Sequence, residues 1–196
     1  MSQIKSLCVY CGASVGDSAV YAEGARQLAA AMVAEKIALV YGGGKVGLMG
    51  VIADEVMRLG GHVTGVIPQA LMDKEVGHTG LSQLHIVKNM HERKALMAEL
   101  SDGFIAMPGG IGTLEELFEV FTWAQLGFHE KPLGLLNIAG FYDSLMVFLR
   151  QTVDARFLKP EHLGLLSNET DPLKLIRELR LAHHLHLNKW IKKDDL

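Results

Sequence analysis

The segment FIAMPGGIGTLEE, residues 104–116, joins a short apolar run to a glycine-rich turn and then to a stretch of helical composition. The segment IALVYGGGKVGL, residues 37–48, repeats the same order. An apolar run of this length that ends in glycines is typical of a buried strand leading directly into a helix. Both segments therefore predict strand–turn–helix units.

The alternation of strand and helix extends along the chain. It is typical of an α/β fold with a doubly wound, mostly parallel, Rossmann-like sheet and helices on both faces. Ligands bind such sheets at the carboxyl ends of the strands, so we expect both glycine clusters at that edge. The predicted strands are Ile4–Tyr10, Ile37–Tyr41, His62–Ile67, Leu84–Val87, Phe104–Met107, Leu133–Asn137 and Leu163–Ser167, and the predicted helices are Ser18–Glu35, Leu48–Leu59, Met90–Leu100, Thr113–Leu126, Phe141–Ala155 and Asp171–His184.

The size and charge of the chain narrow the classes of function. Its 196 residues, 49% hydrophobic and 21% charged, fit a single domain over residues 1–196 with a frayed polar tail at residues 188–196. The net charge is −3 and no basic tract is present, so we expect no binding to nucleic acid or to anionic membranes. No apolar run approaches the roughly 20 residues of a membrane span, and no signal peptide is evident, which predicts a cytoplasmic protein.

Cysteines and histidines give no strong metal motif. Cys8 and Cys11 form a lone CxxC. A strand over Ile4–Tyr10 would send their side chains to opposite faces, which favours a packed Cys8 and a Cys11 at the loop edge over a zinc or redox pair. His183 and His186 share a helix face, but a solvated face is favoured over a ligand pair. We therefore expect no bound metal.

The first glycine loop, GGGKVG at residues 42–47, matches the GxGxxG pattern between a strand and a helix. The next strand ends in PQ at residues 68–69, with no acidic residue for a ribose hydroxyl, and the loop lysine is followed by Val46 where a P-loop has Ser or Thr. NAD binding and a P-loop NTPase are both disfavoured. The backbone at Gly43 and Gly44 can approach a phosphate, and a simple tight turn is the alternative.

The second glycine loop predicts an anion site. Gly109, Gly110 and Gly112 leave backbone N–H groups open at the positive end of the following helix, which suits a phosphate monoester. Thr113 adds a hydroxyl. The alternative is structural, because residues 113–116 (TLEE) also match a capping box in which Glu116 reaches back to the Thr113 N–H.

Arg93 and Lys94 lie in the first turn of a predicted helix. Cations there oppose the helix dipole by roughly 0.3–1 kcal/mol each, so a bound anion or a carboxylate partner would explain them. The alternative is a solvated basic turn. The surrounding string HERKA is not the HExxH motif of zinc proteases.

Together these segments resemble the Lonely Guy (LOG) family of cytokinin riboside 5′-monophosphate phosphoribohydrolases. The resemblance rests on YGGG with GLMG (residues 41–44 and 47–50), MHERK (90–94) and PGGIGTLEE (108–116), and it runs from about Ser6 to Ala155. It implies hydrolysis of the N-glycosidic bond of a nucleoside 5′-monophosphate, giving a free base and ribose 5-phosphate. It also implies a homodimer with the site near the subunit contact, and no metal or organic cofactor.

The resemblance also implies site residues. The motif arginine and the last glutamate of the PGGxGTxxE string are the family's catalytic pair, and they fall on Arg93 and Glu116. The implied substrate contacts are Glu75, Lys94, Gly110, Ile111, Gly112, Thr113, Leu114, Glu115 and Thr122.

Glycosidic cleavage builds positive charge on the ribose, which a carboxylate such as Glu116 can stabilise. Glu115 is its neighbour, and adjacent helical residues diverge by about 100°, so only one of the two can face the ribose squarely. Arg93 could hold the phosphate, orient Glu116 or balance charge on the leaving base. Two other functions stay open, namely a general AMP nucleosidase and a non-catalytic nucleotide-binding module.

Overall fold

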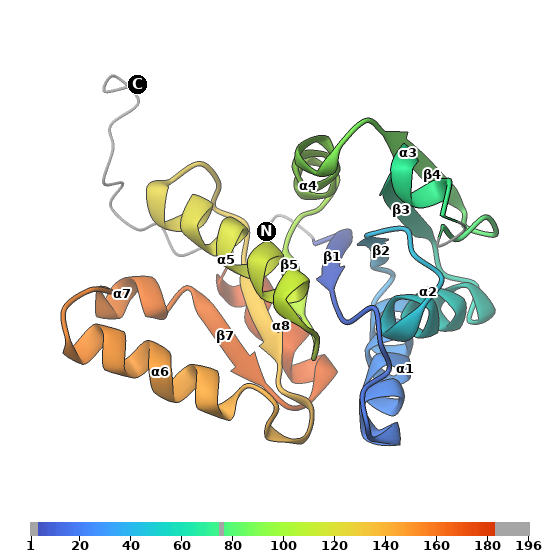
Figure 1. Ribbon diagram of the computed structural model, residues 1–196. Coiled ribbons are helices and arrows are strands. Elements are labelled where there is room, and N and C mark those ends of the chain that lie inside the picture. Colours follow the sequence, from blue (N-terminus) through green and yellow to red (C-terminus); the bar gives the residue numbers. More distant parts are fainter. Residues whose placement is uncertain (1–3, 75–76, 183–196) are drawn as a thin grey trace.

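A computed structural model of the chain describes residues 4–74 and 77–182 (Figure 1). Seven strands form one parallel sheet in the order β4-β3-β2-β1-β5-β6-β7. The doubly wound parallel α/β fold predicted from the sequence is confirmed. The strands are β1 (Ser6–Tyr10), β2 (Ala38–Tyr41), β3 (Val63–Pro68), β4 (Gln83–Val87), β5 (Phe104–Ala106), β6 (Leu133–Leu136) and β7 (Leu166–Glu169).

The described part of the chain has eight α-helices and one short 3₁₀ helix, all between strands except α8, which follows β7. Four-residue α3 and α7 were not predicted, and Leu163, predicted to open the last strand, instead closes α7. The α-helices are α1 (Ala19–Ala34), α2 (Gly47–Arg58), α3 (Gln69–Met72), α4 (Met90–Glu99), α5 (Ile111–Leu126), α6 (Asp143–Asp154), α7 (Pro160–Leu163) and α8 (Pro172–Ala182), and the 3₁₀ helix is η1 (Ile138–Gly140).

Helix α6 begins two residues later than predicted. The Asn137 side chain explains the delay, because its Oδ1 accepts the Tyr142 N–H at 2.7 Å and its Nδ2 donates to Asp143 Oδ1 at 2.7 Å. These bonds hold the chain in a turn until Asp143, where the helix starts.

Two apolar cores cover the two faces of the sheet. Helices α1, α2 and α8 pack on one face, and α4, α5 and α6 pack on the other. Residues of β1 alternate between the cores, since Leu7 and Val9 enter the first and Cys8 and Tyr10 the second. Cys11 joins the first core, so the two cysteines do face opposite sides. Both are free buried thiols, and Cys11 directly follows the end of β1, so the expected packed Cys8 and loop-edge Cys11 are confirmed.

The strand order places a switch point between β1 and β5, which pair directly. The chain leaves β1 toward α1 on one face and leaves β5 toward α5 on the other. The loops after these two strands therefore diverge at the carboxyl edge of the sheet, where ligands bind in folds of this kind.

Some predictions lie outside the described residues. They concern Glu75, the tail at residues 188–196 and the histidine pair His183 and His186. Within the described ranges, no helix combines the length and the apolar character that a membrane span requires.

Candidate active site

Helix α5 starts at the second glycine loop. Its N-cap is Gly110 and its first residue is Ile111, two residues earlier than predicted. Thr113 therefore lies inside the helix, and the capping box is wrong, because the Glu116 carboxylate pairs with Arg93 instead of the Thr113 N–H. The glycine turn explains the early start, since a side chain on Gly109 would lie 2.1 Å from Thr113 Oγ1.

The amino end of α5 is open at two glycines. A side chain added at Gly110 or Gly112 would meet nothing within 4 Å. Thr113, by contrast, is buried and packs against Gly109. The loop thus offers the helix N–H groups and a positive dipole end to a ligand, while the threonine hydroxyl is turned inward.

Arg93 is held from three sides. Its Nε donates to the Val66 carbonyl at 3.2 Å, and its Nη1 donates to Glu116 Oε1 at 2.9 Å. A side chain on Gly42 would lie 1.8 Å from Arg93 Nη2. Glycine is therefore needed at position 42 because the guanidinium occupies the space of a side chain there.

Glu116 forms a buried ion pair with Arg93 across the gap between α4 and α5. Only 11% of its side chain is exposed. Burial raises the pKa of the Glu116 carboxyl above its ordinary value, and the Arg93 charge opposes this rise. The structure thus brings together the two residues that the sequence motifs single out.

Lys94 makes a second interhelical cluster beside the first. Its Nζ donates to Glu115 Oε1 at 2.5 Å and to Glu119 Oε1 at 2.9 Å. Burial lowers the pKa of Lys94, but the two carboxylates outweigh burial and raise it overall. The expectation of a carboxylate partner for these cations is confirmed, and the solvated basic turn is wrong. Glu119 was missed, although its spacing of four from Glu115 on a helix is a readable signal.

The divergence of the two neighbouring glutamates is confirmed. The Glu115 side chain is 52% exposed, whereas that of Glu116 is 11% exposed. Glu116 is turned into the gap between α4 and α5, and Glu115 faces its solvated rim. Ile111 and Leu114 lie on either side of the open glycine at position 112, the first exposed and the second partly buried.

The first glycine loop is a tight turn. Gly43 has a φ of +72°, its carbonyl accepts the His78 N–H at 2.8 Å, and Gly44 pairs with Gly77. Gly43 and Gly44 are both buried, so the loop's backbone is largely engaged within the protein. Its clearest contribution to the site is the space that Gly42 leaves for Arg93.

Thr122 lies away from the other predicted contacts. Its Oγ1 donates to the Phe118 carbonyl at 2.7 Å, and the residue is exposed. It follows Gly112 by ten residues, which is about 15 Å along an α-helix.

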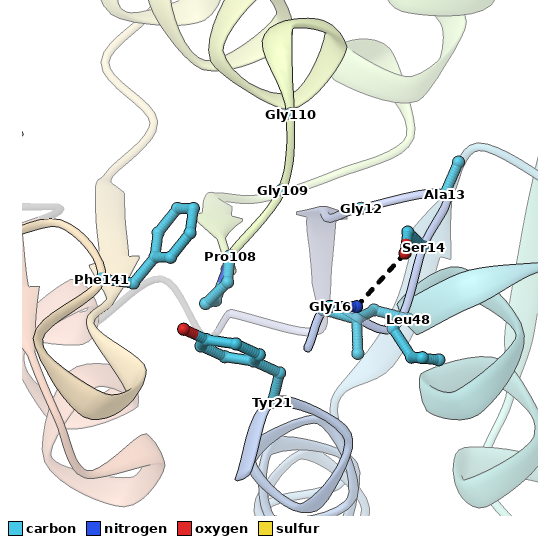
Figure 2. Close-up of a pocket in the computed structure, with 11 residues that line it drawn as sticks. Gly12, Ala13, Ser14, Gly16, Tyr21, Leu48, Pro108, Gly109, Gly110 and Phe141 are labelled. Carbon is cyan, nitrogen blue, oxygen red and sulfur yellow. Dashed lines mark hydrogen bonds between the residues drawn. The ribbon is translucent and has the colours of Figure 1, made fainter. Parts of the chain in front are cut away.

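A cavity of about 460 Å³ opens at the switch point, lined in part by the second glycine loop (Figure 2). The rings of Tyr21 and Phe141 pack edge to face there, with their centroids 5.9 Å apart. Tyr21 and Leu48 belong to the α1 side of the sheet, whereas Arg93 and Glu116 lie on the α4–α5 side. No sequence pattern indicated this cavity. Its lining is mainly apolar and consists of Gly12, Ala13, Ser14, Val15, Gly16, Tyr21, Leu48, Pro108, Gly109, Gly110 and Phe141.

Metal-ligating side chains do not cluster among the residues that the structure describes. No group of three or more His, Cys, Asp or Glu side chains is arranged there to hold an ion. The three carboxylates between α4 and α5 are each paired with Arg93 or Lys94.

The chain is similar to several known proteins. A family model described as "Possible lysine decarboxylase" matches residues 49–179. A cytokinin riboside 5′-monophosphate phosphoribohydrolase of Arabidopsis thaliana is 47% identical over 178 residues, which cover 91% of this chain and 78% of the relative. A second Arabidopsis phosphoribohydrolase of that kind is 48% identical over 178 residues, covering 91% of this chain and 82% of the relative.

Solved structures share the fold. The molybdenum cofactor carrier protein from Chlamydomonas reinhardtii superposes with a TM-score of 0.69 at 19% identity, covering 91% of this chain and 98% of that one. At this level of identity the likeness speaks for the architecture alone.

Proposed function

The chain belongs to the Lonely Guy (LOG) family of cytokinin riboside 5′-monophosphate phosphoribohydrolases, and we propose from this premise that it hydrolyses the N-glycosidic bond of N6-modified adenosine 5′-monophosphates. The products are the free base and ribose 5-phosphate. The observation that carries the proposal is the buried Arg93–Glu116 pair, one turn from the open glycines at the start of α5.

The substrate phosphate binds at the amino end of α5. A side chain added at Gly110 or Gly112 would meet open space, so a ligand can approach the backbone there, and the helix dipole favours an anion. Binding energy from this remote phosphate positions the ribose for reaction. A nucleoside without the 5′-phosphate is accordingly a poor substrate.

The ribose lies with its anomeric carbon beside Glu116. As the C1′–N9 bond breaks, the carboxylate stabilises the positive charge that develops on the sugar. A water molecule forms the new bond to C1′, its hydroxyl stays on the ribose, and its proton goes to the departing base. The 2.9 Å bond from Arg93 supports an orienting role for the guanidinium. Its pKa is too high for it to act as a general acid, so we assign it to holding Glu116 and balancing charge.

The family model's description as a decarboxylase gains no support from the lysines near the fold's ligand edge. A Schiff-base lysine is activated by a lowered pKa. The pKa of Lys94 is raised, since two carboxylates outweigh the effect of burial. Burial does lower the pKa of Lys131, but this residue bonds the Ala98 carbonyl just before β6, at the amino ends of the strands.

A homodimer in the cytoplasm completes the proposal. Thr122 lies ten residues, about 15 Å, beyond Gly112 along α5, and we assign it to the substrate that binds at the start of α5 in a second copy. Ile111, 82% exposed beside the site, supplies apolar surface for that contact. Free buried thiols at Cys8 and Cys11 fit a reducing compartment.

Base release tests the proposal. The protein is incubated separately with isopentenyladenosine monophosphate, with AMP and with adenosine, and free base is measured by chromatography. We expect rapid release from the prenylated nucleotide and very little from adenosine. Release from AMP but not from the prenylated nucleotide would favour a general AMP nucleosidase. No release from either nucleotide, with binding retained, would favour a non-catalytic nucleotide-binding module.

A further inference from the structure

Glu119 contributes to the site without a place in the motif. It lies one turn beyond Glu115 on α5 and bonds Lys94 of α4 at 2.9 Å. Its side chain is 24% exposed, against 52% for Glu115. Of the two partners of the ammonium, Glu119 is thus the more firmly enclosed.

The arrangement sets two cations against three carboxylates. Arg93 and Lys94 are consecutive on α4, and their partners Glu116 and Glu115 are consecutive on α5. The side chain of Lys94 therefore begins next to the Arg93–Glu116 ion pair, although its ammonium bonds other carboxylates. A lysine carries its charge on a flexible four-carbon stem and can change partners readily. Something must therefore keep its ammonium away from Glu116.

We propose that Glu119 is a positioning residue for the hydrolysis, which anchors Lys94 at the rim of the α4–α5 gap and reserves the Glu116 carboxylate for Arg93. The inference rests on the proposed function. It also explains why Lys94 has two partners. Glu115, which is half exposed, can turn to a bound sugar while Glu119 still neutralises the buried ammonium, whose isolation would be costly.

The charges around Glu116 give the proposal a signature. Glu115 and Glu119 raise the pKa of Glu116 in addition to the main effect of burial, whereas Arg93 and Lys94 lower it. Removing the charge of Glu119 therefore lowers that pKa, and removing the charge of Lys94 raises it. The titratable and charged groups that interact electrostatically with Glu116 in the described residues are Arg93 and Lys94 from α4, Glu115 and Glu119 from α5, and Cys8, Tyr10 and Cys11 from β1 and its end.

The test compares the wild type with Glu119→Gln, Lys94→Met and the double variant. Glu55→Gln is the matched control, because Glu55 is also a helical glutamate, 15% exposed, that bonds a cation at 2.6 Å. We expect Glu119→Gln to lower kcat about tenfold, as for a small misplacement of a catalytic group, with little change in KM. Its acid limb in the pH–rate profile moves to lower pH, and that of Lys94→Met moves to higher pH.

Non-additivity separates positioning from a direct role. If Glu119 acts through Lys94, the double variant is no slower than Lys94→Met alone. The proposal is overturned if the two losses multiply, or if Glu119→Gln keeps the wild-type kcat and acid limb. It is equally overturned if Glu119→Gln changes only the melting temperature and matches Glu55→Gln in kcat and acid limb.

A titration without substrate separates this inference from the proposed function. The ¹³C carboxyl signal of Glu116, identified by its loss in Glu116→Gln, is followed against pH in the wild type and in Glu119→Gln. We expect a lower midpoint in the variant. A wild type that releases no base contradicts the proposed function, whereas an unmoved midpoint in an active protein contradicts only the role of Glu119.

Discussion

The two sides of the second glycine loop differ in kind. On the α4–α5 side, buried charges meet in pairs across two helices, with Arg93 bonded to Glu116 at 2.9 Å. On the α1 side, an apolar cavity of about 460 Å³ brings Tyr21 and Phe141 together. Both sides touch the same turn at Gly109 and Gly110. The two sides therefore offer different chemistry, fixed buried charge on the α4–α5 side and apolar volume on the α1 side, and bond cleavage needs charge in a fixed place.

Glu116→Gln gives the largest effect expected on the charged side. The amide keeps the shape and an acceptor for Arg93, so the fold should survive, but the negative charge beside the ribose is lost. We expect base release to fall by about 10²–10⁴-fold, the usual range for a lost acid–base group. Rates are measured with the prenylated nucleotide, and melting is followed in parallel. Wild-type turnover in a folded Glu116→Gln protein would remove this carboxylate from the mechanism.

Gly42→Ala disturbs the Arg93–Glu116 ion pair through the backbone beneath Arg93. The new methyl would lie 1.8 Å from Arg93 Nη2, so the guanidinium must move away from Glu116. We expect a loss of about 10²-fold in kcat, since displacing a catalytic group by about 1 Å has that order of cost. Gly164→Ala, whose methyl lies 3.3 Å from the nearest atom, is the control. Equal activity of both variants would mean that the position of Arg93 is not critical.

The pH profile tests the protonation state on the charged side. Because burial raises the pKa of Glu116, activity should fall already at a pH above the ordinary titration range of a glutamate, as the carboxylate takes up a proton. The acid limb of kcat/KM is measured in the wild type and sought in the residual activity of Glu116→Gln. A limb that persists there would belong to another group.

Phe141→Ala tests the apolar side and has the smallest expected effect on turnover. The centroid of the Phe141 ring lies 5.9 Å from that of Tyr21 and 5.0 Å from that of Tyr142. Such aromatic pairs contribute about 0.5–1.5 kcal/mol each to stability. We expect the melting temperature to fall by a few degrees, roughly 2–4 °C per kcal/mol for a chain of this size, while kcat/KM changes less than about twofold. A large loss of turnover would show that the residues of this cavity take part in the reaction.

The fold could be predicted from the sequence more completely than the site. Alternating apolar runs determined the parallel sheet, because strand and helix periodicities are local properties. The capping box at Thr113 failed because a glycine turn let α5 begin earlier. Lys94 and Glu119 are separated by 25 residues, so no local pattern reveals their bond. The cavity escaped prediction for the same reason, since Tyr21 and Phe141 meet only when the sheet has formed.

A crystal structure with ribose 5-phosphate shows whether a phosphorylated sugar occupies the α4–α5 side, beside Arg93 and Glu116. We expect the phosphate within hydrogen-bond distance of the N–H groups around Gly110 and Gly112, and the anomeric carbon beside the Glu116 carboxylate. Ribose 5-phosphate seated instead in the cavity between Tyr21 and Phe141, with Arg93 and Glu116 untouched, would contradict the account.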